Sequence, residues 1–502
     1  MNEDRTPVLI GAGQLTQRDV DPAEAREPLL MMVETARRAA ADAGADARLL
    51  TQLDTVAVVN IIGWHYANAP QALAEQLAAH PTQELFTTVG GNTPQWLVNE
   101  TAAQIAAGRV RLALLAGAEA VHTLTRARRT HTELRWTLNG TGTPTRVGDP
   151  RPGTTDHETA HGLQAPAAIY PLFENALRAH YGITLSEQRS RLGVLCSRMS
   201  AVAAQNPYAW FQRERSPEEI VTVTPTNRLI GFPYPKYMNA IIDVDQSAAV
   251  LMTSVAHARE LGIDPARWVY LRGCGDAYDR WFMTERLDYY SSPALRLAGQ
   301  KALAMAGLGV ARIDYFDLYS CFPSAAQIAR NMLGIAADDP RALTVTGGLP
   351  YHGGPGNNYS MHAIATMMAK VRAMPGAIGL VSALGWYVTK HAIGIYSAAP
   401  KDGPWVREDP AAYQSEVDRL PGPALAMEPQ GRAQIETYTV IHDREGTPIR
   451  AIIIGRLADG RRFLANTPES GAVFESLMSG ESIGRTGRVS SSNGANCFDP
   501  EV

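Results

Sequence analysis

Residues 313–396 contain three stretches that decide how this chain folds: IDYFDLYSCFPSAAQIARNML (313–333), TGGLPYHGGPGNNYSMHAIATMMAKV (346–371) and AIGLVSALGWYVTKHAIGIY (377–396). The first predicts a short apolar strand, a polar turn and an amphipathic helix. In α/β folds, reactive groups sit where a strand ends and a helix begins. The second holds seven Gly or Asn residues between positions 347 and 358, so its backbone can approach a ligand closely. The third predicts two strands around a Gly-Trp turn. We expect these three loops to converge on one cleft.

The composition is that of a globular protein without a strong electrostatic preference. The chain has 502 residues and a formal net charge of −4. This balance gives no reason to expect nucleic acid or an anionic membrane surface as a partner. The charged N-terminus leads directly into a strand, and no apolar run approaches the roughly 18 residues of a membrane span. We therefore expect no signal peptide, no membrane partner and a cytoplasmic location.

The cysteines give no sign of a disulfide framework. Four are present, far apart in the chain and without a CxxC pair: Cys196, Cys274, Cys321 and Cys497. Structural zinc sites usually show paired ligands at short spacing. The sequence therefore predicts neither a disulfide scaffold nor a metal site.

Alternating strand and helix patterns in the first 120 residues predict a sheet covered by helices on both faces. The expected strands are 7–13, 53–61 and 111–117, and the expected helices are 27–45, 70–79 and 95–107. Thr93 suits the N-cap of the last helix, and Pro94 suits its first position. The alternation recurs from residue 268, which predicts two similar α/β halves.

Two segments break this pattern. Residues 123–240 are charged and rich in Gly and Pro, then helical, which predicts an inserted loop domain. After a Pro-rich stretch, short strands with tight turns predict a small β-barrel. The expected division is an N-terminal half (1–122), a loop domain (123–240), a return to the first sheet (241–266), a C-terminal half (267–399), a linker (400–430), the barrel (431–490) and a tail (491–502).

Four motifs in order give residues 1–399 a resemblance to the thiolase superfamily, especially to the sterol-carrier-protein type of thiolase and its thiolase-like relatives. They are HYGITLSEQRSRLGVLCSRMSAVAAQNP (180–207), DQSAAVLM (245–252), YSCF (319–322) and TGGLPYHGGPGNN (346–358). The resemblance implies an α/β protein with a five-layered αβαβα thiolase fold. It also implies acyl-transfer or other Claisen-type chemistry on a coenzyme A thioester, within fatty acid or sterol metabolism. No tightly bound cofactor is implied. Thiolases usually dimerise, but the additional domain leaves a monomer open.

The departures from the family are as informative as the matches. The nucleophilic cysteine of thiolases falls on Gly91, and the general-base histidine falls on Gly354. The second catalytic cysteine falls near Ser382 or Ala383. Thiolysis needs a thiolate and a base to generate it. Ordinary thiolysis through an acyl-enzyme at position 91 is therefore not expected.

The C-terminal segment resembles the OB-fold domain of partner subunits found beside some thiolase-like enzymes. The matching stretch is ETYTVIHDREGTPIRAIIIGRLADGRRFLAN (436–466). OB folds often bind nucleic acid, but this stretch lacks a basic, aromatic face. We therefore expect no nucleic-acid partner.

The candidate catalytic residues are Cys321, Tyr319, His362 and His352. Cys321 lies near a predicted helix N-terminus, where the dipole lowers a thiol pKa, but it also fits a small buried residue. Tyr319 could donate a proton or simply fill the core at a strand end. His362, and after it His352, could replace the missing base, as could His391, or each could be a capping or core histidine.

The candidate substrate- or CoA-binding residues come from the same loops. Gly90, Gly91 and Asn92 precede a helix N-terminus, whose free N–H groups suit an oxyanion or a phosphate; they could equally form a capped helix start. Asn357, Asn358 and Tyr359 could donate to an oxyanion or shape a turn. The resemblance adds three positions: Gly354, Ser382 and Gly385.

Three functions remain open from the sequence. The first is acyl transfer or another Claisen-type step on a coenzyme A thioester. The second is a retro-aldol lyase acting on a 3-hydroxyacyl-CoA, which would use Tyr319, Tyr359 or His362 and no nucleophilic cysteine. The third is a non-catalytic acyl-CoA-binding protein, favoured by the loss of both nucleophile and base.

Overall fold

The core of the protein is a ten-stranded sheet system with the strand order β10-β11-β12-β9-β1-β8-β4-β2-β3-β5. The computed structural model describes residues 3–138 and 140–501. The N-terminal half contributes β1 (Pro7–Thr16), β2 (Thr55–Val58), β3 (Gln83–Thr87), β4 (Leu112–Ala120) and β8 (Asp245–Ser254). The C-terminal half contributes β9 (Val269–Tyr278), β10 (Tyr315–Asp317), β11 (Gly379–Gly385) and β12 (Lys390–Ser397). The halves meet where Val8 and Leu9 pair with β9.

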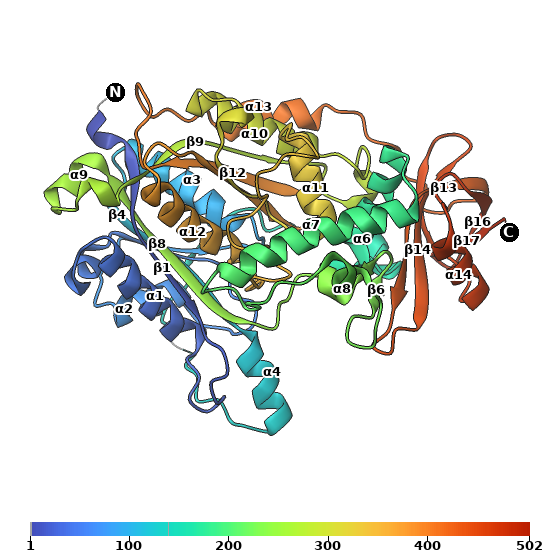
Figure 1. Cartoon of the computed structure of the whole chain (residues 1–502), viewed down its shortest axis with the longest axis horizontal. Helices are drawn as coiled ribbons and strands as arrows, with labels where there is room; N and C mark the ends of the chain where they lie inside the picture. The colour runs from blue at the N-terminus through green and yellow to red at the C-terminus, as the bar shows by residue number, and fades with distance from the viewer. Residues whose placement is uncertain (1–2, 139, 502) are drawn as a thin grey trace.

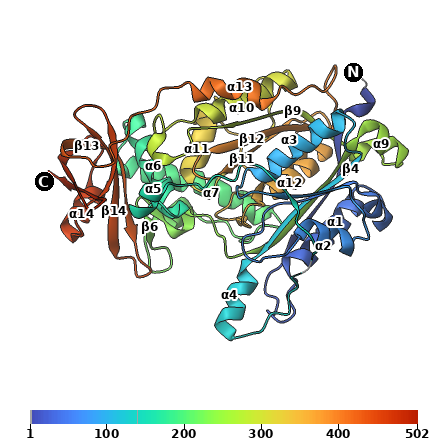
Figure 2. The same ribbon diagram turned by 180° about the vertical axis from the view of Figure 1, so that it is seen from behind.

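Helices complete a five-layered αβαβα body, as the sequence predicts (Figures 1 and 2). One outer layer holds α1 (Pro28–Asp42) and α2 (Ala69–Gln76). The middle layer holds α3 (Thr93–Ala106) and α12 (Tyr359–Ala373). The other outer layer holds α10 (Pro293–Ala306) and α11 (Pro323–Met332). A short helix, α9 (Val255–Glu260), follows β8.

The central strands read as apolar runs because helices cover both of their faces. All nine residues of β4 are buried, and nine of the ten residues of β8 are buried. The helix predicted at 95–107 begins slightly earlier, and Asn92 occupies its N-cap in place of Thr93. The middle layer therefore holds α3 with its N-terminus facing the loops of the C-terminal half.

The inserted segment is helical, as expected, but it is not a separate unit. Its elements are α4 (Val121–Thr130), β5 (Thr145–Val147), α5 (Asp156–Ala160), α6 (Pro166–Tyr181), α7 (Leu185–Gln205), α8 (Pro217–Val221), β6 (Leu229–Gly231) and β7 (Tyr234–Pro235). Strand β5 pairs with β3 of the body sheet, and β6 pairs with the C-terminal barrel. The insertion therefore ties body and barrel together.

The C-terminal segment forms a closed five-stranded β-barrel (Figure 1, red). Its elements are β13 (Gly431–His442), β14 (Pro448–Leu457), β15 (Arg462–Asn466), α14 (Gly471–Ser479), β16 (Thr486–Ser492) and β17 (Ala495–Pro500). The strands close in the order β13-β14-β15-β17-β16-β13, and β15 pairs with β17 in parallel. A helix between the third and fourth strands completes this topology, which supports the OB-like prediction.

Two predicted boundaries are wrong. The expected tail at 491–502 contains β17, whose pairing with β16 and β15 closes the barrel. The sequence SSSNGANCFDP hid this strand because its side chains are small and polar, while only Asn496, Phe498 and Pro500 turn inward. The expected linker at 400–430 contains α13 (Pro410–Asp418), which packs its buried Tyr413 against the body.

The barrel docks through the face on which OB folds commonly bind their ligands. Ile452, Ile454 and Leu464 of β14 and β15 belong to the same apolar cluster as α6 and α11. Polar contacts reinforce the junction: the Asn175 side-chain amide donates to the Tyr438 carbonyl at 2.8 Å, and the Thr437 hydroxyl donates to the Leu172 carbonyl at 2.6 Å. This face is consequently covered by the body.

Candidate functional site

Four loops lie together at the N-terminus of α3, and three of them are the loops that the sequence predicts to converge. They precede α3 (88–92), follow β10 (318–322), precede α12 (347–358) and join β11 to β12 (386–389). The backbone N–H of Gly90 donates to Asn357 Oδ1 at 2.8 Å, and the Ser360 hydroxyl donates to the Gly91 carbonyl at 3.1 Å. These bonds fix the first loop against the glycine-rich one.

A tyrosine from another loop fills the space beside Gly91, the position at which the resemblance to thiolases places their nucleophile. A Cβ added to Gly91 would overlap the hydroxyl oxygen of Tyr319 and would lie 2.7 Å from the carbonyl oxygen of Leu384. Tyr319 is buried, and its hydroxyl has no hydrogen-bond partner within residues 3–138 and 140–501. The packing therefore excludes any side chain at position 91 and puts a phenolic hydroxyl in its place.

Two of the predicted binding residues, Gly90 and Gly385, lie against the side-chain amide oxygen of a third, Asn92. Gly90 has φ of +154°, and a Cβ there would lie 2.5 Å from Asn92 Oδ1 and 2.8 Å from Lys390 Nζ. A Cβ on Gly385 would overlap the same Asn92 oxygen. Asn92 is buried, makes no capping bond with its side chain, and leaves Oδ1 without a partner. Glycine at 90 and 385 thus makes room for an unsatisfied acceptor.

Gly354, the position at which the resemblance to thiolases places their general base, contributes only backbone. Its N–H donates to the Ile241 carbonyl at 2.8 Å. A Cβ would lie 3.3 Å from Leu349 Cδ2 and 3.4 Å from the Ile241 carbonyl oxygen. No imidazole reaches this point from residue 354, so any base must come from elsewhere.

Four of the predicted site residues form a continuous row of rings. The rings of His362 and His352 lie 5.0 Å apart between centroids, those of His352 and Tyr359 lie 5.7 Å apart, and those of Tyr359 and Tyr319 lie 5.4 Å apart. All three contacts are edge-to-face, which suits aromatic quadrupoles. The row ends at the Tyr319 hydroxyl beside Gly91. The structure thus brings together residues from two of the quoted stretches, 313–333 and 346–371.

Both histidines of this row are held neutral. Each is completely buried, and burial lowers the pKa of His352 to about 4 and that of His362 well below its usual range. His362 Nδ1 lies 2.8 Å from the Gln14 Oε1 acceptor, so this nitrogen carries the proton. The Nε2 atoms of both histidines lack partners among the described residues. They can accept a hydrogen bond but are weak bases.

Tyr359 belongs to a buried carboxylate network. Its hydroxyl donates to Asp317 Oδ1 at 3.0 Å and lies 2.6 Å from the Thr346 hydroxyl. Asp317 Oδ2 accepts from the Thr344 hydroxyl at 2.8 Å and from the backbone N–H of Val345 at 3.0 Å. Burial raises the pKa of Asp317, and these donors oppose the shift. The network anchors the glycine-rich loop to β10, the strand that leads into the loop of Tyr319.

The other predicted polar residues are occupied by backbone contacts. Asn358 Nδ2 donates to the Gly117 carbonyl at 2.7 Å, and Ser382 Oγ accepts from the backbone N–H of Tyr319 at 3.0 Å. His391 Nε2 donates to the Val388 carbonyl at 3.0 Å. These residues hold loops in place and show no contact with Gly91.

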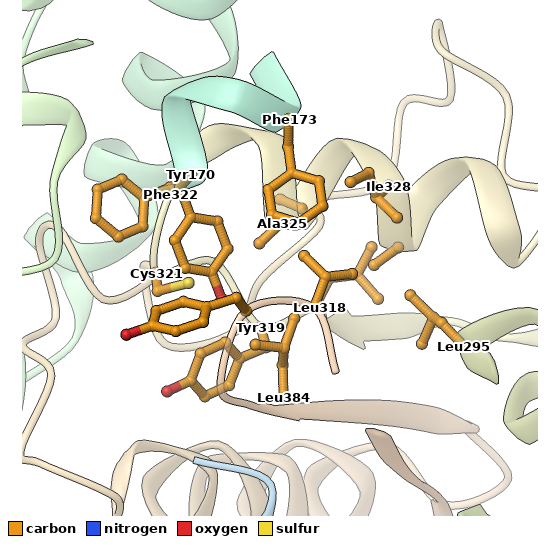
Figure 3. Close-up of a cluster of buried hydrophobic side chains, with 14 of the residues drawn as sticks. Tyr170, Phe173, Leu295, Leu318, Tyr319, Cys321, Phe322, Ala325, Ile328 and Leu384 are labelled. Carbon is orange, nitrogen blue, oxygen red and sulfur yellow. The ribbon is translucent and has the colours of Figure 1, made fainter. Parts of the chain in front are cut away.

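Cys321 lies in an aromatic cluster rather than at an activated position. Figure 3 shows its thiol beside Tyr170 and Tyr319, with Phe322 next to it. The rings of Tyr170 and Phe322 stack at 4.6 Å. Burial raises the pKa of the Cys321 thiol to about 12, and the nearby Tyr170 hydroxyl offsets only part of that rise. The predicted helix-dipole activation is outweighed by the loss of water.

Two buried ionisable residues near the site escaped the sequence analysis. Glu119 accepts from the backbone N–H groups of Ile62 and Gly63, and burial raises its pKa to about 7. Lys390 is the first residue of β12. The signal for Lys390 was a lysine beside an otherwise apolar strand, in a chain with only five lysines.

Two cavities border this region. One, of about 540 Å³, runs along α3 past Asn92 and Lys390; its walls include Trp96, Tyr278 and Trp281. The other, of about 390 Å³, lies between α6, α7 and α11 and is lined by three arginines: Arg191, Arg198 and Arg330. Neither is lined by Tyr319, Cys321, His352 or His362.

Two further features of the described residues bear on function. No cluster of three or more His, Cys, Asp or Glu side chains in residues 3–138 and 140–501 could hold a metal ion. Over the same residues, every helix is too short or too polar to traverse a lipid bilayer.

Sequence comparisons point to the thiolase-like proteins. A family model described as "Thiolase-like protein type 1 additional C-terminal domain" matches residues 412–494. Acetyl-CoA acetyltransferase 1 of Arabidopsis thaliana is 28% identical over 144 residues, which cover 29% of this chain. The match spans 32% of the length of that relative.

Two solved structures share the fold over most of this chain. The Ltp2-ChsH2(DUF35) aldolase is 19% identical, with a TM-score of 0.57 over 78% of this chain and 97% of that chain. Acetyl-CoA acetyltransferase from Syntrophomonas wolfei is 16% identical, with a TM-score of 0.54 over 78% and 99%. These two likenesses concern the fold.

A third solved structure matches body and barrel together. It is the monomeric SCP2-thiolase like protein type 1 from Mycobacterium smegmatis, which is 37% identical, with a TM-score of 0.86 over 99% of this chain and 100% of that chain. At this identity and coverage, the chain belongs to the family of SCP2-thiolase-like proteins type 1.

Proposed function

We propose that this protein binds a coenzyme A thioester and acts on it by Claisen-type acyl chemistry without forming an acyl-enzyme at position 91. The observation that carries the proposal is the Tyr319 hydroxyl, which stands where a side chain of residue 91 would be. Membership of the thiolase-like family supports the ligand class. The partial likeness to Acetyl-CoA acetyltransferase 1 supports a role in acyl transfer and lipid metabolism. No tightly bound cofactor is part of this proposal.

The arginine-lined cavity supports a route for the ligand. Coenzyme A carries phosphates, and guanidinium groups bind phosphates through paired hydrogen bonds. The inner wall of this cavity includes Met199, whose sulfur lies 3.4 Å from the Cβ position of Gly348. The Ser320 hydroxyl, which has no partner among the described residues, borders the same glycine. A thioester that follows this route would approach the loop carrying Tyr319.

The neutral residues of the site favour hydrogen-bond donation over nucleophilic attack. Burial raises the pKa of Tyr319, so its hydroxyl stays protonated and can donate to a thioester oxygen. Retro-aldol cleavage of a 3-hydroxyacyl thioester is the second candidate, favoured by this hydroxyl. That reaction needs a donor at the thioester oxygen and an acceptor for the 3-hydroxyl proton. Tyr319 and the free Nε2 of His352 are of the right types.

The test combines binding and product analysis. Calorimetric titration with acetyl-CoA, a 3-ketoacyl-CoA and a 3-hydroxyacyl-CoA should show saturable binding of at least one thioester. Mass spectrometry of the same mixtures should show products but no acyl adduct on the protein. Tyr319→Phe should lower turnover by roughly 100-fold or more, because one proton donor is lost, with little change in affinity.

Two controls separate the alternatives. Cys321→Ala should leave turnover unchanged, and an acyl adduct on Cys321 in the wild type would overturn the proposed chemistry. Arg330→Ala should weaken binding, whereas Arg312→Ala, an exposed arginine outside the cavity, should not. Binding without turnover would identify a non-catalytic acyl-CoA-binding protein. Absence of binding across the panel would refute the ligand class.

We also propose that the protein is a monomer. The edge of β3 is already paired with β5 of the same chain, through Leu85–Thr145, Phe86–Arg146 and Thr87–Val147. Strand β5 now forms the edge of the sheet and has only three residues, and very short edge strands disfavour pairing with a second copy. Light scattering during size-exclusion chromatography should give the mass of one chain, and a dimer mass would contradict this proposal.

A further inference from the structure

The cavity of about 540 Å³ beside α3 contains a lysine that no part of the proposed acyl-CoA chemistry uses. Lys390 lines the cavity, yet only 6% of the residue is exposed. Its Nζ donates to the Val89 carbonyl at 2.6 Å. It forms no ion pair within residues 3–138 and 140–501. Of the five lysines of the chain, it is the only buried one.

The surroundings of Lys390 destabilise its charged form. Its ammonium lies 5.7 Å from the centroid of the Trp281 ring and 5.6 Å from that of Trp386. These indoles supply some cation–π attraction but replace the water that an ammonium normally binds. Arg151, stacked 3.7 Å over Trp281, adds positive charge, and Asp149 opposes it. Burial outweighs the attraction and lowers the pKa of Lys390 to about 8.

A second group in the cavity lacks a partner. Asn92 Oδ1 is buried and accepts no hydrogen bond from the described residues. It lies close to the amine, since a Cβ on Gly90 would be 2.5 Å from Asn92 Oδ1 and 2.8 Å from Lys390 Nζ. A buried acceptor left unpaired carries a free-energy cost. A ligand hydroxyl that enters the cavity would remove this cost.

The turn that leads into Lys390 is strained. Trp386 and Val388, neither of them glycine, have φ of +55° and +58°. Such conformations are rare, above all for a β-branched residue, and each is energetically unfavourable. Arg286 donates to the Tyr387 carbonyl and to the Thr389 hydroxyl, which holds the turn in place. The fold thus spends stability to hold the residues before Lys390 in one conformation.

We infer that Lys390 is a carbonyl-binding amine, and that its cavity takes a small hydroxyaldehyde or hydroxyketone as an imine. The neutral Nζ attacks the carbonyl carbon to form a carbinolamine. Loss of one water molecule then forms the C=N bond, and the oxygen of the carbonyl leaves in that water. The ligand hydroxyl donates to Asn92 Oδ1, and its carbon chain lies along Trp281 and Tyr278.

The test is reductive trapping on the intact protein. Glycolaldehyde is added at pH 7 with sodium cyanoborohydride, which converts an imine to a stable secondary amine, and the label is located by peptide mass spectrometry. A lysine of pKa near 8 has on the order of a hundredfold more neutral amine at this pH than an ordinary lysine. We expect at least about tenfold more label on Lys390 than on any of Lys236, Lys301, Lys370 or Lys401.

Matched variants separate a site from general reactivity. Lys390→Met should remove the dominant label, and Lys301→Met should not; Lys301 is also partly buried, 4.8 Å from the Tyr413 ring. Asn92→Ala should reduce the preference for glycolaldehyde over propionaldehyde, which has no hydroxyl. Even labelling of all five lysines, or no label on Lys390 in the folded wild type, would overturn the inference. Thioester binding in the panel above does not depend on this outcome.

Discussion

At the scale of single residues, the site is defined by Gly91 and Tyr319, because the space between them has room for only one side chain. Tyr319 occupies the volume in which a side chain of residue 91 would stand. Restoring a cysteine at 91 alone would therefore overpack the loop instead of recreating a thiolase nucleophile. Position 91 therefore has no room for a side chain because two loops pack against each other there.

Gly91→Cys tests this packing. The variant should lower the free energy of unfolding by roughly 1–3 kcal/mol, the usual cost of overpacking. In a double-mutant cycle, Gly91→Cys should cost less in a Tyr319→Ala background than in the wild type, because the overlapping ring is gone. Urea denaturation measures both. Gly309→Cys is the control, because Gly309 is exposed with nothing near its Cβ position and has φ of −97°. Equal stability of Gly91→Cys and wild type would contradict the overlap.

The reactivity of the cysteines gives a second prediction. Iodoacetamide at pH 8 should modify the half-buried Cys497 first and leave Cys321 unmodified, because a buried thiol with a pKa of about 12 has almost no thiolate. Timed alkylation with peptide mapping provides the measurement. Fast modification of Cys321 in the folded protein would show that it is an activated nucleophile after all.

Glu119 should make stability depend on pH. Its pKa is raised from 4.5 in the unfolded chain to about 7 in the fold, so the folded state holds the proton more tightly. Its contribution is therefore present below pH 4.5 and is lost as the pH rises towards 7, at up to about 1.4 kcal/mol per pH unit. The free energy of unfolding, measured from pH 4.5 to pH 7, should vary less with pH in Glu119→Gln than in the wild type. Parallel curves for variant and wild type would exclude this effect.

At the scale of elements, one arginine secures β15 to the body. Arg462 is completely buried, pairs with Glu436 at 2.6 Å, and donates to the carbonyls of Thr284 and Arg286. Its planar guanidinium can satisfy all of these acceptors at once. The barrel is consequently fixed by contacts that a flexible linker would not provide.

Arg462→Ala should lower the free energy of unfolding by roughly 3 kcal/mol, because it leaves two buried carbonyls without their donor and removes one of the two arginines that pair with the partly buried Glu436. The neighbouring Arg461→Ala is the control. Arg461 pairs with Asp459 on the surface, and such exposed pairs contribute about 0–1 kcal/mol. Chemical denaturation of both variants gives the comparison. Similar losses for the two would show that the docking contact is weak.

At the scale of the whole molecule, body and barrel share one apolar core. Side chains of β14 and β15 pack with α6, which in turn contacts α11 (Figure 1). Strand β6 of the insertion also pairs with β13. Separation of the two parts would expose apolar surface on both.

Thermal unfolding should therefore show one calorimetric transition for the intact chain. Cooperative units that share a core unfold together. Arg462→Ala should lower the midpoint of this transition, or split it if docking fails before either part melts. Two well-separated transitions in the wild type would indicate independent domains.

The sequence alone was enough to predict the repeated strand and helix pattern, the thiolase-like motifs with glycine at positions 91 and 354, and the barrel up to its third strand. These features depend on local periodicity and on short motifs, so they can be recognised without knowing which distant residues pack against them. It missed β17, because that strand is recognisable only by the partners that close the barrel. Three features followed only from the tertiary structure: Tyr319 fills the space beside Gly91, burial raises the pKa of the Cys321 thiol, and Lys390 and Asn92 line one cavity. Steric overlap and desolvation depend on residues that are remote in the chain, so the reactivity of each group is set by the fold that surrounds it.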